Sequence, residues 1–169
     1  YALLATGIGA AVFAYATAYL PRHLRQTGRA ARERWRFWPW MALFCAAMVG
    51  LAAAQDLILL FVLFDLTAIC SYFLIGFDKE RRATRVAALT ALLVTGIGAV
   101  ALLIGALLLH ADHGTFQLPA IAARLAAGGG GDPTVAAALI AVAALAKSAQ
   151  VPLHFWLPRA MAAPTPVSA

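Results

Sequence analysis

Five long apolar stretches separated by short polar segments form the main pattern of this chain. They cover residues 1–20, about 37–54, 57–77, about 86–109, and a stretch that begins at Pro133. At a rise of 1.5 Å per residue, about 20 apolar residues cross a bilayer core of about 30 Å. Because a helix satisfies its own backbone hydrogen bonds in lipid, the pattern predicts an all-α integral membrane protein with about five transmembrane helices.

The polar segments predict where these helices begin and end. Pro21 lacks an N–H group and is expected to end the first helix, whereas Pro133 suits the first turn of the fifth. The segment from His110 to Asp132 is expected to be a loop that ends in a flexible glycine linker, because the glycine run lacks the residues of a phosphate loop. His110 and His113 are spaced like metal ligands but have no cysteine or carboxylate cluster, so we expect surface histidines and no metal.

Composition separates this chain from ordinary globular proteins. Hydrophobic residues make up 63% and charged residues 12% of the sequence, and the mean hydropathy is +0.84. Soluble domains carry about a quarter charged residues, so a soluble domain is excluded. Six arginines between Arg22 and Arg36 could suggest a nucleic-acid site, but they lie between two spans and beside several aromatic residues, which favours an interfacial loop and no nucleic acid. Cys45 and Cys70 lie within spans and are interpreted as small hydrophobic residues.

The basic residues also predict the orientation. Of 13 Lys and Arg residues, six follow the first span and four follow the third, whereas the segments after the second and fourth spans hold none and one. Basic loops resist translocation, so the first two segments are expected to face the cytoplasm. The fifth helix then runs from the outer side toward the inner side.

Two charges are predicted to lie inside the membrane. Asp65 is the only acid within a span, about 12 Å below the outer edge, and Lys147 lies about 20 Å down the fifth helix. Desolvation drives each toward its neutral form, whereas pairing holds both charged. If the third and fifth helices pack together, the two could form a proton-handling pair. The alternatives are a static ion pair that only fixes packing and a lysine that snorkels to the headgroups.

Pro152 predicts a break in the fifth helix close to Lys147. It removes a backbone donor and crowds the preceding turn, so freed polar groups must find other partners. His154 follows Lys147 by seven residues, the spacing of one face of an unbroken helix, and histidine titrates near neutral pH. It is therefore a candidate proton relay, or else a hydrogen-bond partner for the freed backbone.

Longer motifs carry a resemblance to a known family. The segment Lys147–Pro158 reads KSAQVPLHFWLP, and Ala163–Ala169 reads APTPVSA. Together they resemble the core signature of the antiporter-like membrane subunits shared by respiratory complex I and the Mrp cation/proton antiporters. The stretch Gln55–Phe77, and the stretch Ala87–Leu109 with the loop beyond it as far as Leu118, favour the A subunit of an Mrp (Mnh) antiporter. The resemblance covers roughly residues 40–169.

The resemblance implies roles for individual residues. In the family, an acid in the third-helix motif and the lysine of the broken helix handle protons, which carries these roles to Asp65 and Lys147. Relatives usually have Trp-Glu where this chain has Phe64-Asp65, and often another residue at Arg159. Aspartate is one methylene shorter than glutamate, so its carboxylate reaches less far toward Lys147.

The resemblance also implies a biological setting. The chain is expected to be a fragment of a larger helical bundle, with residues 1–40 forming a first helix and basic cytoplasmic loop and residues 41–169 forming part of the proton-conducting domain. The expected function is exchange of Na⁺ or another monovalent cation for protons in a bacterial cytoplasmic membrane, with other membrane subunits as partners and without a cofactor or catalytic residues. The alternatives are a proton-translocating subunit of complex I or a membrane-bound hydrogenase, and a structural scaffold subunit.

Overall fold

The computed structural model describes residues 2–28, 31–161 and 163–168, and helices follow one another along almost all of them. Two short 3₁₀ helices, η1 and η2, interrupt the α-helices. The elements are α1 (Ala2–Gln26), η1 (Ala31–Arg36), α2 (Phe37–Ala53), α3 (Leu57–Ile75), α4 (Arg82–His113), α5 (Leu118–Ala126), α6 (Thr134–Lys147), η2 (Leu153–Phe155), α7 (Trp156–Ala160) and α8 (Thr165–Ser168).

Within the described residues, four helical segments are long and apolar enough to cross a membrane: Leu3–Gln26, Glu33–Ala53, Leu57–Ile75 and Arg82–His113. Helix α6 is apolar as well but has only 14 residues. Large apolar side chains are widely exposed, as in Leu93 and Ile97 of α4, which suits a surface that faces lipid or other membrane helices. The predicted helical membrane fold is therefore confirmed.

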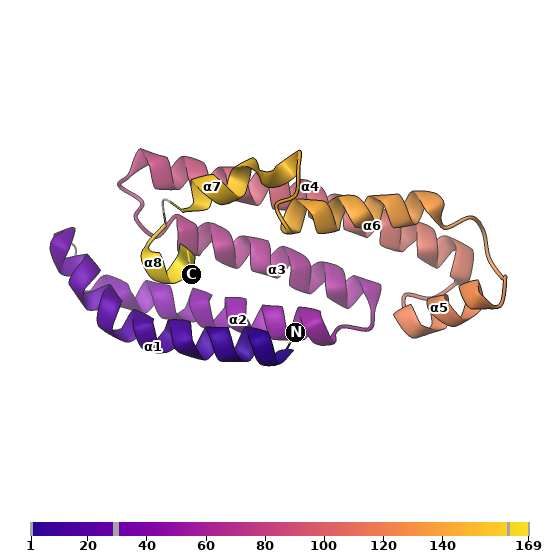
Figure 1. Cartoon of the computed structure of the whole chain (residues 1–169), viewed down its shortest axis with the longest axis horizontal. Coiled ribbons are helices and arrows are strands. Elements are labelled where there is room, and N and C mark those ends of the chain that lie inside the picture. The colour runs from indigo at the N-terminus through magenta and orange to yellow at the C-terminus, as the bar shows by residue number, and fades with distance from the viewer. Residues whose placement is uncertain (1, 29–30, 162, 169) are drawn as a thin grey trace.

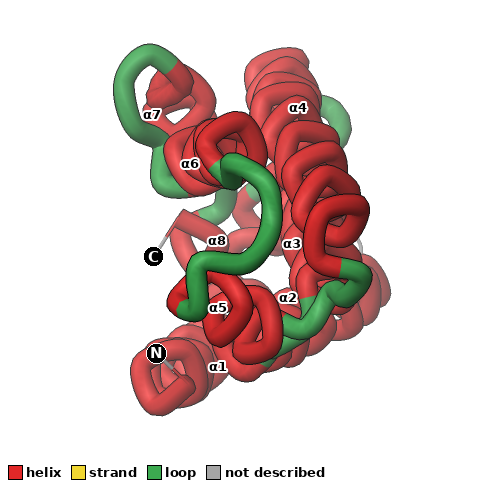
Figure 2. Tube along the Cα trace, turned by 90° about the vertical axis from the view of Figure 1, so that its right-hand side faces the viewer, coloured by secondary structure: helices red, strands yellow, loops and turns green. Residues whose placement is uncertain are grey.

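The long helices form a row in which each packs against the next. Figure 1 shows α1, α2, α3, α4 and α6 running along the long axis of the molecule. Contacts join α1 to α2, α2 to α3, α3 to α4, and α4 to α6. Helix α5 lies at one end of the long axis and α8 lies toward the other end, as Figure 1 shows. Figure 2 shows the molecule turned by 90°, with the long helices viewed largely end-on. The row brings the third and fifth apolar stretches close to each other through their common neighbour α4.

The prediction that Pro21 ends the first helix is wrong. Pro21 lies inside α1, which continues to Gln26. Leu20 and Leu24, one turn apart on either side of the proline, are both buried and pack in the same hydrophobic cluster as Phe37 of α2. This apolar stripe at helical spacing extends past the proline, and its burial offsets the lost backbone hydrogen bond.

Part of the predicted outer loop is a helix that sequence reasoning missed. Helix α5 packs Ile121 into a cluster with Leu57 of α3 and Leu109 of α4. The segment before it is also held in place, because Leu57 N donates to Phe116 O at 3.0 Å. Asp56 caps α3 by accepting hydrogen bonds from two backbone amides of its first turn, as expected for an N-cap aspartate.

The prediction that both outer histidines lie on the surface is wrong for His113. Its side chain is 2% exposed, and Nδ1 lies 3.0 Å from Leu109 O. Gly130, with φ at +103°, lies so close that a Cβ at this position would be 2.6 Å from His113 Nε2. Gly130 therefore packs over His113, at a position where a side chain would not fit without a shift.

Two hydrogen bonds hold the chain in place at the start of α6. Asp132 Oδ1 accepts from Thr134 Oγ1 at 2.5 Å and from Thr134 N at 3.0 Å. These two bonds, the side-chain one first, lower the pKa of Asp132 from its ordinary value. The start of α6 is thus fixed by an ionised carboxylate placed near the positive end of the helix dipole.

Small residues allow α4 and α6 to approach closely. A Cβ added at Gly98 would lie 2.9 Å from Ala146 Cβ, and one added at Gly105 would lie 2.9 Å from Ile140 Cγ1. Interfaces of this kind, with glycine and alanine facing each other, are typical of membrane helix pairs. Because Ala146 precedes Lys147, this packing also determines where the lysine lies.

We expect Gly98→Ala to destabilise the protein, since the added methyl group meets both Ala146 and the backbone of Ala143. Overpacking costs about 1–3 kcal/mol. Gly96→Ala is the matched control, because nothing lies within 4 Å of a Cβ at Gly96. Thermal unfolding of the detergent-solubilised complex should show a lower midpoint for Gly98→Ala alone, and equal midpoints for the two variants would contradict this account of the interface.

At the end of the molecule that carries the basic segments, a side-chain contact joins two parts of the chain that are distant in sequence. His23 Nε2 of α1 lies 2.9 Å from Asp78 Oδ2 in the α3–α4 loop, and both side chains are largely buried. Thr84 Oγ1 of α4 donates to Asp78 O at 2.6 Å. The segments after the first and third spans therefore lie at the same end, as their charges predict.

We expect this end to face the cytoplasm. Arg29, in the middle of the basic segment, lies outside the described residues, so single cysteines at the exposed Glu80 and Ala127 are the better probes. An impermeant maleimide added to intact cells should label Ala127→Cys and leave Glu80→Cys unlabelled until the cells are opened. Labelling of Glu80→Cys in intact cells would show that this end faces the outside of the cell. The parent with only Cys45 and Cys70 gives the background.

Candidate functional site

Helix α6 ends at Lys147, five residues before Pro152. Ala149 adopts a left-handed conformation with φ at 51°, and Gln150 N donates back to Leu145 O at 2.9 Å. This is the pattern of a Schellman helix end, which normally uses glycine at the left-handed position. The indole Nε1 of Trp156 donates to Ala146 O at 3.0 Å and satisfies another of the carbonyls that the helix end leaves free. Helical turns resume only at Leu153.

The ammonium of Lys147 reaches across to α3. Its Nζ donates hydrogen bonds to Thr67 Oγ1 and, at 3.3 Å, to Phe64 O. It also lies 4.7 Å from the centre of the Phe64 ring, within the range of a cation–π contact. Directly beside these groups is a cluster in which Phe64 packs with Ala99 and Leu102 of α4 and with Ala143 of α6. Lys147 is therefore held by protein groups, an arrangement that differs from a lysine snorkelling to the headgroups.

Asp65 lies between the two residues of α3 that bind Lys147. The side chain of Lys147 reaches α3 beside Asp65, but the carboxylate and the ammonium do not form an ion pair among the residues that the structure describes. The lysine instead uses a backbone carbonyl and a hydroxyl from the same turn of α3. The paired proton-handling role of Asp65 and Lys147 stays a prediction.

The structure separates His154 and Pro152 from this contact. Both are exposed, and His154 lies in η2 beyond the end of α6. Because the helix ends at Lys147, the spacing of seven residues no longer places His154 on the same helical face. The relay role of His154 stays a prediction, and Trp156 supplies the indole bond to the helix end.

Sequence reasoning missed Thr67 and Trp156 as members of the site. Thr67 occurs three residues after Phe64, so the two share one face of α3, and that spacing was the available signal. Trp156 gave no such signal, because its contact with Ala146 depends on how the chain turns after α6. Among the described residues, no group of three or more His, Cys, Asp or Glu side chains could hold a metal ion.

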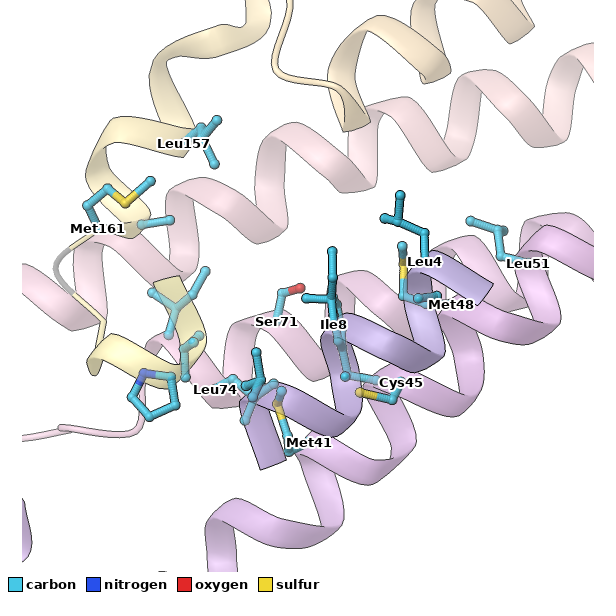
Figure 3. Close-up of a pocket in the computed structure, with 18 of the residues that line it drawn as sticks. Leu4, Ile8, Met41, Cys45, Met48, Leu51, Ser71, Leu74, Leu157 and Met161 are labelled. Atoms are coloured by element: carbon cyan, nitrogen blue, oxygen red, sulfur yellow. The ribbon is translucent and has the colours of Figure 1, made fainter. Parts of the chain in front are cut away.

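A separate apolar cavity of about 610 Å³ lies between α1, α2 and α3 on one side and α7 and α8 on the other. Figure 3 shows Ile8, Met48, Leu74 and Leu157 around it. Lys147 and Asp65 do not line it, and the hydroxyl of Ser71, which does, already donates to Thr67 O at 2.7 Å. The cavity therefore lacks the chemistry of a proton site.

Comparison with known proteins supports the interpretation of the motifs. Residues 54–169 match the family described as NADH:quinone oxidoreductase/Mrp antiporter, transmembrane. The A/B chain of a probable K⁺/H⁺ antiporter of Rhizobium meliloti is 38% identical over 173 residues, and the A1 chain of a Na⁺/H⁺ antiporter of Staphylococcus haemolyticus is 35% identical over 170. The chloroplastic NAD(P)H-quinone oxidoreductase subunit 5 of Adiantum capillus-veneris is 36% identical over 173. These alignments cover 99–100% of this chain and only 16–23% of the relatives.

Solved structures give the same result. A chain of the Mrp complex from Dietzia sp. DQ12-45-1b is 38% identical, with a TM-score of 0.83, and the match covers 99% of this chain and 18% of that one. A chain of the archaeal membrane-bound sulfane sulfur reductase is 28% identical with a TM-score of 0.70, covering 76% of this chain and 26% of that one. The row of helices and the lysine at the end of α6 are consistent with this family match. The chain belongs to the NADH:quinone oxidoreductase/Mrp antiporter family of multi-pass membrane proteins.

Proposed function

We propose that this chain is part of a membrane subunit of a multisubunit antiporter that exchanges protons for Na⁺ or another monovalent cation, and that Lys147 and Asp65 lie on its proton path. Residues 41–169 would form part of the proton-conducting domain, and residues 1–40 a preceding helix and cytoplasmic segment. Other membrane subunits would complete the complex. The antiporter names of the relatives from Rhizobium and Staphylococcus support this assignment.

One observation carries the proposal: a lysine at the end of an apolar helix reaches into the protein and not toward lipid. Its ammonium binds Phe64 O and Thr67 Oγ1 on either side of Asp65. An ionisable side chain held in this way inside a membrane protein commonly belongs to an ion or proton pathway.

The proposed proton step needs only these groups. The neutral amine of Lys147 accepts a proton, and the ammonium is stabilised by its acceptors on α3 and by the nearby charge of Asp65. Moving the ammonium away from α3 removes that stabilisation, so the proton passes to the next acceptor. His154, exposed beyond the helix end, is our candidate for it. The segment from Ser148 to Pro152, which lies between α6 and η2, would allow the movement.

A second candidate is a proton-translocating subunit of a redox-driven complex. It is favoured by the resemblance to the Adiantum protein and by a Synechocystis NAD(P)H-quinone oxidoreductase chain 5 that is 38% identical over 140 residues. In that case the same lysine would move protons, but electron transfer elsewhere in the complex would supply the energy.

Transport in everted membrane vesicles separates the two functions. With a proton gradient already formed by respiration and the donor then exhausted, addition of Na⁺ or K⁺ should release protons, read by the fluorescence of a pH-sensitive dye. Vesicles from cells lacking the complex give the background. Proton movement that requires NAD(P)H and quinone and ignores both cations would overturn the antiporter proposal in favour of the redox-driven one.

A further inference from the structure

Thr67 is a buried residue of the candidate site, and the family resemblance assigned it no role. Its side chain is 0% exposed and it faces the end of α6. Its hydroxyl donates to Phe64 O at 2.7 Å, so the oxygen lone pairs are left to accept the hydrogen bond from Lys147 Nζ. A threonine hydroxyl has one proton to donate and two lone pairs, which fits this division of roles.

The three groups around the ammonium form a neutral cradle, which we define as Phe64 O, Thr67 Oγ1 and the Phe64 ring. The carbonyl and the hydroxyl each accept one ammonium N–H, and the ring centre lies 4.7 Å from Nζ. An ammonium has three N–H donors, so the cradle supplies a partner for each without a direct ion pair. Holding the ammonium at neutral oxygens is weaker than holding it at a carboxylate, which keeps the proton releasable.

We propose that Thr67 is a positioning residue that holds the protonated form of Lys147 against α3, and that it thereby sets the pH range in which the protein exchanges protons. This inference rests on the proposed function of Lys147. The charged or titratable groups near Lys147 are Asp65 and Cys70 on α3, whereas His154 is exposed and lies in η2, beyond the helix end. On α4, the residues described in contact with this part of α6 are Gly98, Ala99 and Leu102, which do not titrate.

Thr67→Val tests the inference, because valine keeps the shape of threonine and removes the acceptor. The pH profile of cation-driven proton release should move to lower pH by roughly one unit, since hydrogen bonds to charged groups are among the stronger ones and a higher proton concentration must replace the lost bond. Thr67→Ser keeps the hydroxyl and should restore the parent profile. Thr95→Val is the matched control, because Thr95 is a buried threonine of α4 whose hydroxyl donates to Ala91 O at 2.7 Å.

The outcomes separate failure of the inference from failure of the proposed function. If Thr67→Val keeps the parent profile while Lys147→Ala is inactive, the positioning role is wrong and the function of Lys147 stands. If Thr95→Val shifts the profile as far as Thr67→Val, the effect is general and the positioning role is again wrong. If Thr67→Val does not assemble, Thr67→Cys replaces it: the weakly accepting sulfur should shift the profile in the same direction, and an unchanged profile overturns the inference.

Discussion

Replacing Lys147 with alanine is expected to abolish cation-driven proton exchange while the complex still assembles. The substitution removes the group that would carry the proton, and Phe64 O keeps the hydrogen bond from Thr67, so no buried donor on α3 is left without a partner. Dye-monitored proton release in everted vesicles should fall to the level of membranes that lack the complex. Co-purification of the partner subunits checks assembly.

Two further variants show whether titration or positive charge alone is needed. Lys147→Arg keeps a positive charge, but a guanidinium stays protonated and does not release its proton, so we expect it to be inactive as well. Lys79→Ala removes the other lysine of the chain, which is exposed in the α3–α4 loop, and should leave exchange unchanged. Full exchange in Lys147→Ala at matched expression would remove Lys147 from the proton path.

The sequence predicted the membrane-spanning segments well because their physical signal is strong. Helices α2 and α3 match the expected ranges to within two residues at each end. An apolar run long enough to cross a bilayer has few alternatives to a helix, since lipid offers no partner for an unpaired backbone group. The charge asymmetry of the loops also placed the two basic segments at one end, as the His23–Asp78 contact shows.

The errors occurred where tertiary packing outweighs a local rule. Pro21 was expected to stop α1, but the buried stripe through Leu20 and Leu24 continues beyond it. His113 was expected at the surface because its segment looked like a loop, whereas α4 extends to His113 and Gly130 covers the imidazole. Neither contact can be read from spacing, because each depends on a second segment whose position the sequence pattern leaves open.

For the candidate site, the sequence predicted which charges stand out and not how they are held. Asp65 and Lys147 were distinctive because an ionisable residue in an apolar helix is rare. Their relative depths indicated that the two could approach each other if their helices packed together, and that pairing stays a prediction. The partners of Lys147, Phe64 O and Thr67 Oγ1, could not be chosen in advance, because a backbone carbonyl carries no sequence signal and one hydroxyl among many is not distinctive.

Asp65→Asn is expected to move the pH profile of exchange to lower pH without abolishing exchange. The carboxylate forms no ion pair with Lys147, so it acts through space and its removal leaves the cradle of Phe64 and Thr67 intact. The ammonium then loses an attractive charge while its desolvation is unchanged, and a higher proton concentration is needed to protonate it. A nearby opposite charge shifts titration by about 1–3 units, and the lack of direct contact favours a shift of roughly one unit.

Two further variants test whether the distance between the carboxylate of residue 65 and Lys147 matters. Asp65→Glu extends the side chain by one methylene toward Lys147 and should move the profile to higher pH, or leave it unchanged if the cradle already holds the ammonium firmly. Glu80→Gln, which removes an exposed acid in the α3–α4 loop, is the control, because solvent and salt screen its charge. If Asp65→Asn keeps the parent profile, or if Glu80→Gln shifts it as far, then Asp65 does not stabilise the protonated lysine, and the neutral cradle alone must hold it.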